Sequence, residues 1–452
     1  MEKLFKLSSI DGRYYEMTQE LVNYFSEYAF FKYRHRVEIL YFIFLIKLDF
    51  NELGKLKEGD NIKNLNKLIK DFNVNRCLEI KEIEKKITHD VKSIEYHLIK
   101  QFEMINLRDY SHFIHFGLTS QDINNPSLTL MLKEGINDII IPNLETIMKT
   151  INQLFLDWMD IVMTSHTHGQ PAVPTTLGKE FQVFHYRIKK QLDILKDVKY
   201  YTKFGGAVGN LNAHYSSYPN QEWDKHFSIF INCIGLERDI LTTQIDNYEN
   251  MAVVFDCLRR INTVLIDFNR DIWHYISIEY LVQSFNNNEV GSSTMPQKIN
   301  PINFENSEGN LLLANSQLDF MSNKLPVSRL QRDLTDSTTL RNLGTIFGHM
   351  LIGYKNLVKG LGKLKPNKFK IADDLENNFS IISEGIQVIL KKHGIKNGYE
   401  LVKNMSRNNE KMTRTKMKEF VDTLDVSNVV KEELLNLEPS NYIGNADKIK
   451  VY

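Results

Sequence analysis

The sequence contains few of the residues that interrupt helices. It has 10 prolines in 452 residues, with none between Pro219 and Pro296, and it has no glycine from Leu236 to Val290. Strand-like alternation of apolar and polar residues is also scarce. Long stretches without either helix breaker favour long helices, so we expect an all-α fold.

Cysteine is scarce as well. Cys77, Cys233 and Cys257 are widely spaced, odd in number and not arranged as CxxC. This pattern argues against a disulfide-stapled scaffold and against a zinc ribbon. We expect core or surface thiols in a reducing compartment.

The chain has no excess charge of either sign and no long hydrophobic run. Its 56 Lys and Arg balance 56 Asp and Glu, for a net charge of +0. No overall attraction to nucleic acid or to a membrane follows from that balance. The apolar stretch 41–46 is too short to span a bilayer, and residues 1–5 lack the pattern of a cleavable leader. We expect a cytoplasmic protein without nucleic-acid or membrane partners.

The clearest helix is expected at 251–281. Its apolar residues alternate at steps of four and three, which is a heptad seam typical of helices that pack at a shallow angle. Either a long core helix within one chain or a bundle shared between subunits fits this spacing. The seam consists of Val254, Leu258, Ile261, Leu265, Phe268, Ile272 and Tyr275.

Other segments predict further helices and the domain plan. We expect helices at about 127–160, with Pro142 at a kink or junction, at 177–201 and at 303–324, whereas the polar stretch 55–66 looks like a loop or insertion. Shorter periodic segments follow from about residue 365. The length allows two or three domains, and we expect three helical domains at 1–107, 108–362 and 363–452.

The most specific motif is the segment 291–300, which reads GSSTMPQKIN and is followed by Glu305. We expect its glycine and serines to give a mobile polar loop, in which Ser292 offers an oxygen that could take a proton. A serine is a poor base unless its alkoxide is stabilised, so it needs a nearby cation such as Lys298 and a closed, dry site. An ordinary linker between helices is the plain alternative.

A second segment, 165–171, reads SHTHGQP. An imidazole such as that of His168 has a pKa near working pH, so it can give or take a proton. A metal site at His166 and His168 is the rival interpretation, but CxxC, HExxH and a carboxylate ladder are all missing beside it.

Two further segments suit ligand binding at helix ends. In the segment 88–90, His89 and Asp90 would share a ligand if they lie at a helix end, although an HD pair also occurs in metal phosphohydrolases. Thr119 and Ser120 open the segment TSQDINN, and hydroxyls at an electropositive helix N-terminus suit a carboxylate. A capped helix is the plain alternative in both places.

An arginine cluster lies at 328–342, which reads SRLQRDLTDSTTLRN, and an Asp-Gly-Arg-Tyr segment lies at 11–14. Guanidinium groups bind phosphate bidentately, so the cluster is a plausible cradle for a nucleotide phosphate and ribose. A solvated helix face is the plain alternative.

Taken together, these segments resemble the fumarase/aspartase superfamily, and in particular its bacterial-type adenylosuccinate lyase branch. The segment 291–300 with Glu305 resembles the signature loop (residues 288–302 here), 167–172 the THGQPA segment, and 119–125 the TSxDxNN segment. The resemblance continues through 203–214, 243–245 and 441–444 and so spans almost the whole chain. Thr88 departs from the branch, where asparagine is common.

The resemblance implies two catalytic residues and a set of binding residues. His168 is the acid that protonates the leaving nitrogen, and Ser292 is the base, with Ser293 not excluded by spacing. The implied substrate-binding residues are Arg13, Tyr14, Thr88, His89, Asp90, Thr119, Ser120, Gln244, Ser293, Lys298, Asn300, Asn306, Arg332, Ser337, Thr338 and Arg341.

The resemblance also implies the reaction. It is β-elimination of fumarate from adenylosuccinate, giving AMP, and from SAICAR (a succinyl-aminoimidazole carboxamide ribotide), giving AICAR, in purine biosynthesis. No cofactor or metal is implied. Members of the superfamily are homotetramers in which several subunits contribute to each site, around a central long-helix bundle.

Three alternatives stay open from the sequence. Another lyase of the superfamily, such as argininosuccinate lyase, fumarase or aspartase, would share the signature loop. A metal-dependent HD phosphohydrolase would lose its activity with a chelator. A silent structural protein would have no need of Ser292, His168 and Lys298.

Overall fold

The computed structural model describes residues 2–48, 50–284, 295, 297–406 and 412–449. Helices dominate this part of the chain, which confirms the expected all-α fold, and the few short strands pair two by two. None of the helices described is both long and apolar enough to cross a bilayer.

The chain divides into two compact units. The first comprises Met1–Asn143, Gln191–Thr263 and Asn310–Gly353, and the second comprises Leu144–Lys190, Val264–Gly309 and Tyr354–Tyr452. The long helices α8 (Ile141–Trp158), α9 (Leu177–Asp197), α12 (Glu249–Ser277), α13 (Ile302–Lys324) and α15 (Leu343–Leu361) have residues in both units.

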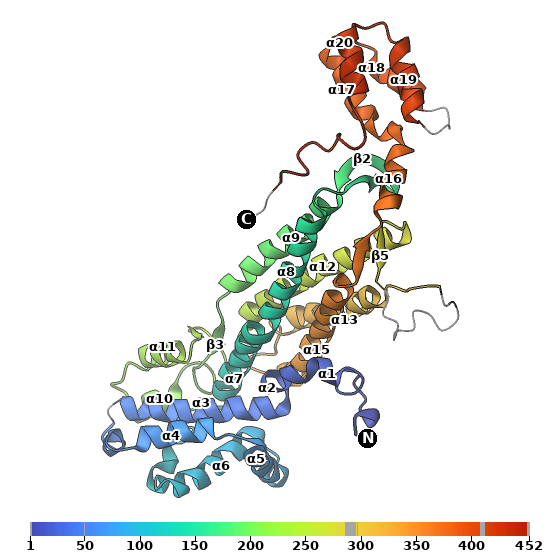
Figure 1. Cartoon of the computed structure of the whole chain (residues 1–452). Helices are drawn as coiled ribbons and strands as arrows, with labels where there is room; N and C mark the ends of the chain where they lie inside the picture. Colours follow the sequence, from blue (N-terminus) through green and yellow to red (C-terminus); the bar gives the residue numbers. More distant parts are fainter. Residues whose placement is uncertain (1, 49, 285–294, 296, 407–411, 450–452) are drawn as a thin grey trace. The chain divides into compact units, whose positions relative to one another are not determined.

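The first unit is built around α3 (Glu27–Lys47), which packs against α7 (Ser120–Gly135), α4 (Asn61–Lys70) and α6 (Asp90–Met104) (Figure 1). Ser26 caps α3 by accepting a hydrogen bond from the Ala29 N–H. The parallel strands β3 (Tyr201–Lys203) and β4 (Glu237–Asp239) also belong to this unit. Its other elements are η1 (Glu2–Phe5), α1 (Tyr15–Thr18), η2 (Gln19–Leu21), α2 (Val22–Phe25), η3 (Gly54–Lys57), α5 (Val74–Ile87), η4 (Arg108–Phe113), η5 (Ile136–Ile140), α10 (Asn212–Ser217), α11 (Trp223–Cys233) and α14 (Thr335–Leu340).

The second unit holds two antiparallel strand pairs and a cluster of short helices. Strand β1 (Val162–Thr167) pairs with β2 (Gln170–Thr176), and β5 (Leu281–Gln283) pairs with β6 (Leu364–Pro366). The shorter helices expected after residue 365 are present, and α17 to α20 gather into one group (Figure 1). They are α16 (Lys368–Glu376), η6 (Phe379–Ile382), α17 (Ser383–Lys392), α18 (Gly398–Ser406), α19 (Arg414–Thr423) and α20 (Asn428–Leu435).

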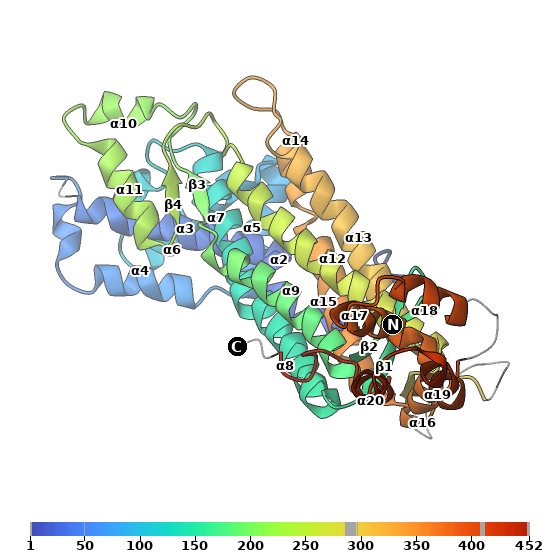
Figure 2. The ribbon, with the colours of Figure 1, turned by 90° about the horizontal axis from the view of Figure 1, so that it is seen from above.

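The heptad seam is confirmed as the buried side of α12. Its first six residues are fully or almost fully buried, and Tyr275 is half-buried. Helices α12 and α13 run side by side (Figure 2). Arg259 pairs with Asp319, and further along α12 Arg270 pairs with Glu308, which comes earlier in α13, so the two helices are antiparallel.

The other expected helices are present with shifted ends. The segment expected at 127–160 begins earlier, at Ser120, and consists of α7, the π-helix η5 and α8, so Pro142 does lie at a junction. Proline has no N–H for an α-helical hydrogen bond, and the π-helical turn ends at Ile140, two residues before Pro142. Helix α9 ends at Asp197, short of the expected 201, and α13 begins at Ile302.

The expectation of a loop at 55–66 is wrong. The turn η3 covers Gly54–Lys57, and α4 begins at Asn61. Leu65 and Leu68 are buried on one side of α4, and its charged residues lie on the other. Two leucines three residues apart anchor this helix, although the local composition is that of a polar linker.

Candidate active site

The junction between α5 and α6 presents three predicted residues to one cavity. Thr88 ends α5 in a left-handed conformation (φ 53°), which turns the chain sharply. His89 then caps α6, and its Nδ1 accepts a hydrogen bond from the Lys92 N–H at 3.2 Å. Asp90 is the first residue of α6. The expected helix end is therefore present, and it directs these side chains into the cavity.

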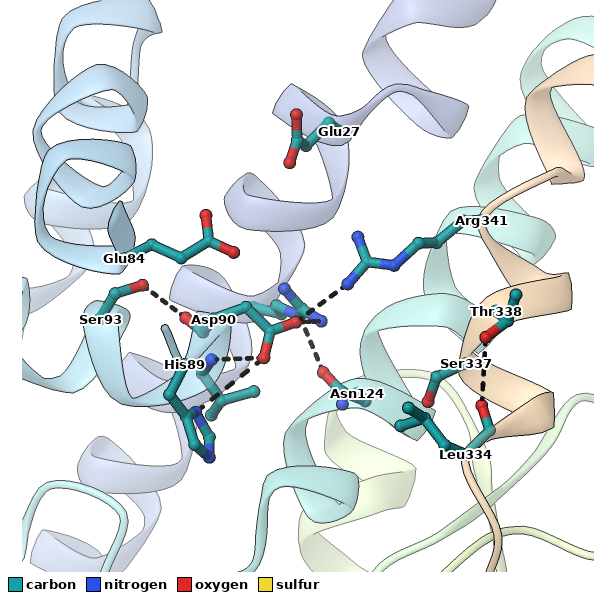
Figure 3. Close-up of polar contacts among 12 residues, drawn as sticks. Glu27, Glu84, His89, Asp90, Ser93, Asn124, Leu334, Ser337, Thr338 and Arg341 are labelled. Atoms are coloured by element: carbon teal, nitrogen blue, oxygen red, sulfur yellow. Dashed lines mark hydrogen bonds and ion pairs between the residues drawn. The ribbon is translucent and has the colours of Figure 1, made fainter. Parts of the chain in front are cut away.

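The Asp90 carboxylate is held by two guanidinium groups. Its Oδ2 accepts hydrogen bonds from Arg34 Nη2 at 2.7 Å and from Arg341 Nη2 at 3.2 Å, and Asp90 and Arg341 point toward one another (Figure 3). Burial alone would raise the pKa of Asp90, but the two cations bring it below its ordinary value. Burial lowers the pKa of Arg34 to about 10, so this side chain stays charged at neutral pH.

The start of α7 forms another wall. Thr119 occupies the N-cap position, and Asp122 Oδ2 accepts a hydrogen bond from the Thr119 N–H at 2.9 Å. Ser120 follows as the first helical residue and lines the cavity together with Gln121 and Asn124. Thr119 is thus an N-cap, and Ser120 lies at the positive end of the helix dipole.

Asp122 fixes this wall from behind. Its Oδ1 accepts hydrogen bonds from Lys203 Nζ at 2.6 Å, from the Gly205 N–H at 2.8 Å and from the Gly206 N–H at 3.1 Å. Both charged side chains are fully buried. Burial by itself would raise the pKa of Asp122, yet the Lys203 ammonium holds it below its usual range.

The arginine cluster supplies the opposite wall. Arg332 donates from Nη1 to Gln244 Oε1 at 3.0 Å and from Nη2 to Ser337 Oγ at 3.4 Å. Asp336 is buried and accepts hydrogen bonds from the Ser337 N–H at 2.6 Å and from the Tyr248 hydroxyl at 2.9 Å. This segment is therefore tied to the turn before α12.

These walls enclose a cavity of about 630 Å³ within the first unit. Seven predicted residues line it: Thr88, His89, Asp90, Ser120, Arg332, Ser337 and Arg341. Three guanidinium groups, helix-end hydroxyls and apolar side chains meet there, which suits an anionic ligand with a flat ring system. The apolar part consists of Phe25, Phe30, Leu128, Met131, Leu334, Leu340 and Leu343.

Other predicted residues of the first unit are not among those that line this cavity. Gln244 reaches it through Arg332. The exposed Thr338 donates its hydroxyl hydrogen to the Leu334 carbonyl at 3.4 Å. Arg13 and Tyr14 precede α1, with the Arg13 guanidinium 5.8 Å from the centre of the Tyr14 ring. A smaller cavity of about 320 Å³ near them shares Arg341 with the larger one.

The remaining predicted residues belong to the second unit. His168 is exposed at the tip of the β1–β2 hairpin, where it and Gly169 both have positive φ (53° and 73°). Lys298 is exposed, and Asn300 and Asn306 are half-buried. Ser292 and Ser293 lie outside the described residues.

The cavity lining also includes residues that were not predicted from the sequence, among them Arg34, Asn124 and Tyr248. Asn124 lies inside the TSQDINN motif but was not singled out. The sequence gives no signal for Arg34, because it lies beside Lys32, His35 and Arg36 in the most polar part of α3. Tyr248 has a left-handed backbone (φ 65°), which its sequence context does not reveal.

Family models match most of the chain. A model described as "Lyase" matches residues 12–314, and one described as "Adenylosuccinate lyase C-terminal" matches residues 328–443. Among the described part of the chain, no group of three or more His, Cys, Asp or Glu side chains is arranged to hold a metal ion.

Curated relatives match over their full length. The chain is 45% identical to an adenylosuccinate lyase of Dictyostelium discoideum over 453 residues, covering 98% of this chain and 97% of the relative. It is 41% identical to an adenylosuccinate lyase of Escherichia coli strain K12, covering 99% and 98%.

Solved structures of other enzymes share the fold. A fumarate lyase from Mesorhizobium sp. BNC1 superposes with a TM-score of 0.72 at 16% identity, covering 95% of this chain and 96% of that one. A 3-carboxy-cis,cis-muconate lactonizing enzyme from Pseudomonas putida gives 0.72 at 17% identity, covering 95% and 94%. Because the family models and the curated adenylosuccinate lyases match nearly its whole length, the chain belongs to the adenylosuccinate lyase family of the fumarase/aspartase superfamily and is a C–N lyase.

Proposed function

We propose that this lyase eliminates fumarate from adenylosuccinate, giving AMP, and from SAICAR, giving AICAR, in purine biosynthesis. The observation that carries the proposal is the cavity of the first unit, where Arg332, Arg341 and Ser337 face Asp90 and Ser120. Guanidinium groups bind a nucleotide phosphate, and hydroxyls at the start of α7 bind a succinyl carboxylate. Arg13, Tyr14, Thr88, His89, Thr119, Gln244 and Thr338 complete the proposed binding set.

The reaction is a β-elimination. Ser292, as alkoxide, takes the proton from the carbon next to a carboxylate, and the extra negative charge of the aci-carboxylate is stabilised by Lys298 and by N–H donors of the signature loop. The C–N bond then breaks, its electron pair goes to nitrogen, and His168 protonates that nitrogen. Fumarate leaves with the new C=C bond. No electron acceptor is needed, so the proposed mechanism uses neither metal nor cofactor.

The exposed position of His168 supports its proposed role. The two-residue turn of His168 and Gly169, in which both φ values are positive, places the imidazole at the tip of the β1–β2 hairpin, where a substrate can reach it. Ser293, Asn300 and Asn306 are proposed to contact the ligand beside Lys298.

We further propose a homotetramer with shared active sites in the cytoplasm, built from helical domains at 1–107, 108–362 and 363–452. Large apolar side chains that stay exposed on α13, those of Leu312, Leu313 and Phe320, support this, because contact with other subunits would cover them.

The function is tested by supplying purified protein, in EDTA, with adenylosuccinate, SAICAR, argininosuccinate and fumarate in separate reactions. Turnover of the first two, read by AMP or AICAR and fumarate, is expected. Turnover of argininosuccinate or hydration of fumarate instead would assign a sister lyase. Loss of activity in EDTA would point to a metal-dependent enzyme.

A further inference from the structure

Arg34 is a buried cation beside the proposed phosphate-binding residues, and the proposed mechanism does not use it. Its side chain is 2% exposed, and its guanidinium lies 3.5 Å from the centre of the Phe30 ring. A charge in this position is costly to bury unless every partner is well placed. Its conformation is therefore set by the contacts that satisfy it.

Those contacts join three segments. Arg34, on α3, donates from Nη2 to Asp90 Oδ2 at 2.7 Å and from Nε to Asn124 Oδ1 at 2.8 Å. Asp90 begins α6 and Asn124 lies on α7, so one planar guanidinium sets the spacing of two cavity walls. A planar fork with fixed donors holds both acceptors in set directions, whereas a lysine ammonium would keep the charge beside Asp90 without this fixed geometry.

The same carboxylate oxygen also accepts from Arg341. The distance to Arg341 Nη2 is 3.2 Å, longer than the 2.7 Å to Arg34, and the Arg341 side chain is 52% exposed against 2% for Arg34. The ion pair of Asp90 with Arg34 is thus shorter and better shielded from water than its ion pair with Arg341. One carboxylate between two guanidinium groups leaves an excess positive charge at the exposed one.

We propose that Arg34 is a positioning residue for anion binding: by neutralising Asp90 from the buried side, it leaves the Arg341 guanidinium available to a phosphate. This inference rests on the proposed nucleotide-binding function. Without Arg34, Asp90 pairs with Arg341 alone. The N–H donors of Arg341 are then directed at Asp90 and not at the ligand. The cavity also loses one positive charge.

The test measures AMP affinity by isothermal titration calorimetry for the full chain and its variants, with circular dichroism as a check on folding. Arg34→Met is expected to weaken AMP binding on the order of tenfold, the effect of losing one hydrogen bond to a charged group. The turnover number for adenylosuccinate is expected to change much less than KM. Arg34→Lys keeps a cation beside Asp90 and is expected to restore most of the affinity.

Arg36 provides a matched control. It lies two residues further along α3 and pairs with Glu134 at 2.8 Å, with both side chains about one-third exposed and outside the cavity lining. Arg36→Met is expected to bind AMP as the wild-type chain does. An equal loss from both variants would show a general effect of α3 and overturn the proposal.

A double-mutant cycle identifies the route of the effect. Because Arg34 is proposed to act through Asp90 on Arg341, the loss in Arg34→Met/Arg341→Met should be smaller than the product of the two single losses. A loss of affinity in the double variant equal to the product of the two single losses would overturn the proposal. Should Arg34→Met not fold, the AMP affinity of Arg34→Lys serves as the test. An affinity of Arg34→Lys as poor as that of Arg341→Met would contradict the proposal. Wild-type protein that neither binds AMP nor turns over adenylosuccinate would instead refute the proposed function itself.

Discussion

At the scale of single residues, the first unit places fully buried charges directly behind the cavity. Asp122 gathers Lys203, two glycine N–H groups and the Thr119 N–H around one carboxylate. Taking one partner away from such a pair leaves an uncompensated charge in the interior, which is far more costly than losing an exposed ion pair. The stability of the unit and the position of Thr119 therefore depend on the same contact.

Lys203→Met should destabilise the chain by about 3–5 kcal/mol, because it leaves Asp122 buried without its cation. Urea denaturation followed by circular dichroism measures this. Lys225→Met is the control: Lys225 pairs with Glu222 at 3.1 Å on the exposed surface, and its loss should change stability by less than about 0.5 kcal/mol. Similar midpoints for the two variants would contradict the account.

Residue types in motifs predicted much of the cavity. The segments at 88–90, 120 and 332–341 were expected to bind a ligand, and the structure brings members of all three together. Arg34 could not be found in the same way. Its importance comes from being surrounded by α6 and α7, which only the tertiary structure determines.

At the scale of elements, glycine conformations fix the turn between β3 and α10. Gly209 has φ 86°, and a Cβ placed there would lie 2.1 Å from the Thr242 carbonyl oxygen. The turn thus combines a left-handed backbone with close approach of another backbone segment. Only glycine meets both conditions.

Gly209→Ala should destabilise the chain by more than about 1–2 kcal/mol, the cost of the left-handed conformation alone. Gly309, in the middle of α13, offers the opposite case, since a Cβ there meets nothing within 4 Å. Gly309→Ala should stabilise by about 0.5–1 kcal/mol. Thermal unfolding of both variants checks the signs, and equal shifts in the same direction would be inconsistent with this turn geometry.

Helices with strong periodicity were predictable, and short elements were not. The seam of α12 fixes both its existence and its buried side. Helix α4 was missed because its lysines and asparagines resemble a linker. The β1–β2 hairpin that carries His168 was missed because β1 has no regular alternation: two adjacent residues are buried and its end is exposed.

At the scale of the whole molecule, the scarcity of proline and glycine was enough to predict an all-α fold. The sequence alone does not reveal which unit carries each of the proposed catalytic residues. His168 and Lys298 belong to the second unit, whereas the cavity belongs to the first. Shared sites in a tetramer are the proposed way in which several chains supply one site.

Mixing His168→Ala and Ser292→Ala chains tests shared sites. Each variant alone should be inactive. If the two residues of one site come from different subunits, random mixing of two chain types should restore about a quarter of the wild-type activity. Co-refolded mixtures that stay inactive, while each variant still assembles as the wild-type chain does, would argue against sharing.

The central claim is that binding and proton transfer are divided between the cavity and His168, and the kinetics of His168→Ala with adenylosuccinate test it most directly. Loss of a general acid should lower kcat by roughly 10²–10⁴-fold and leave KM within a few-fold of wild type, because the cavity residues are unchanged. A near-normal kcat, or a large rise in KM with kcat preserved, would contradict the account.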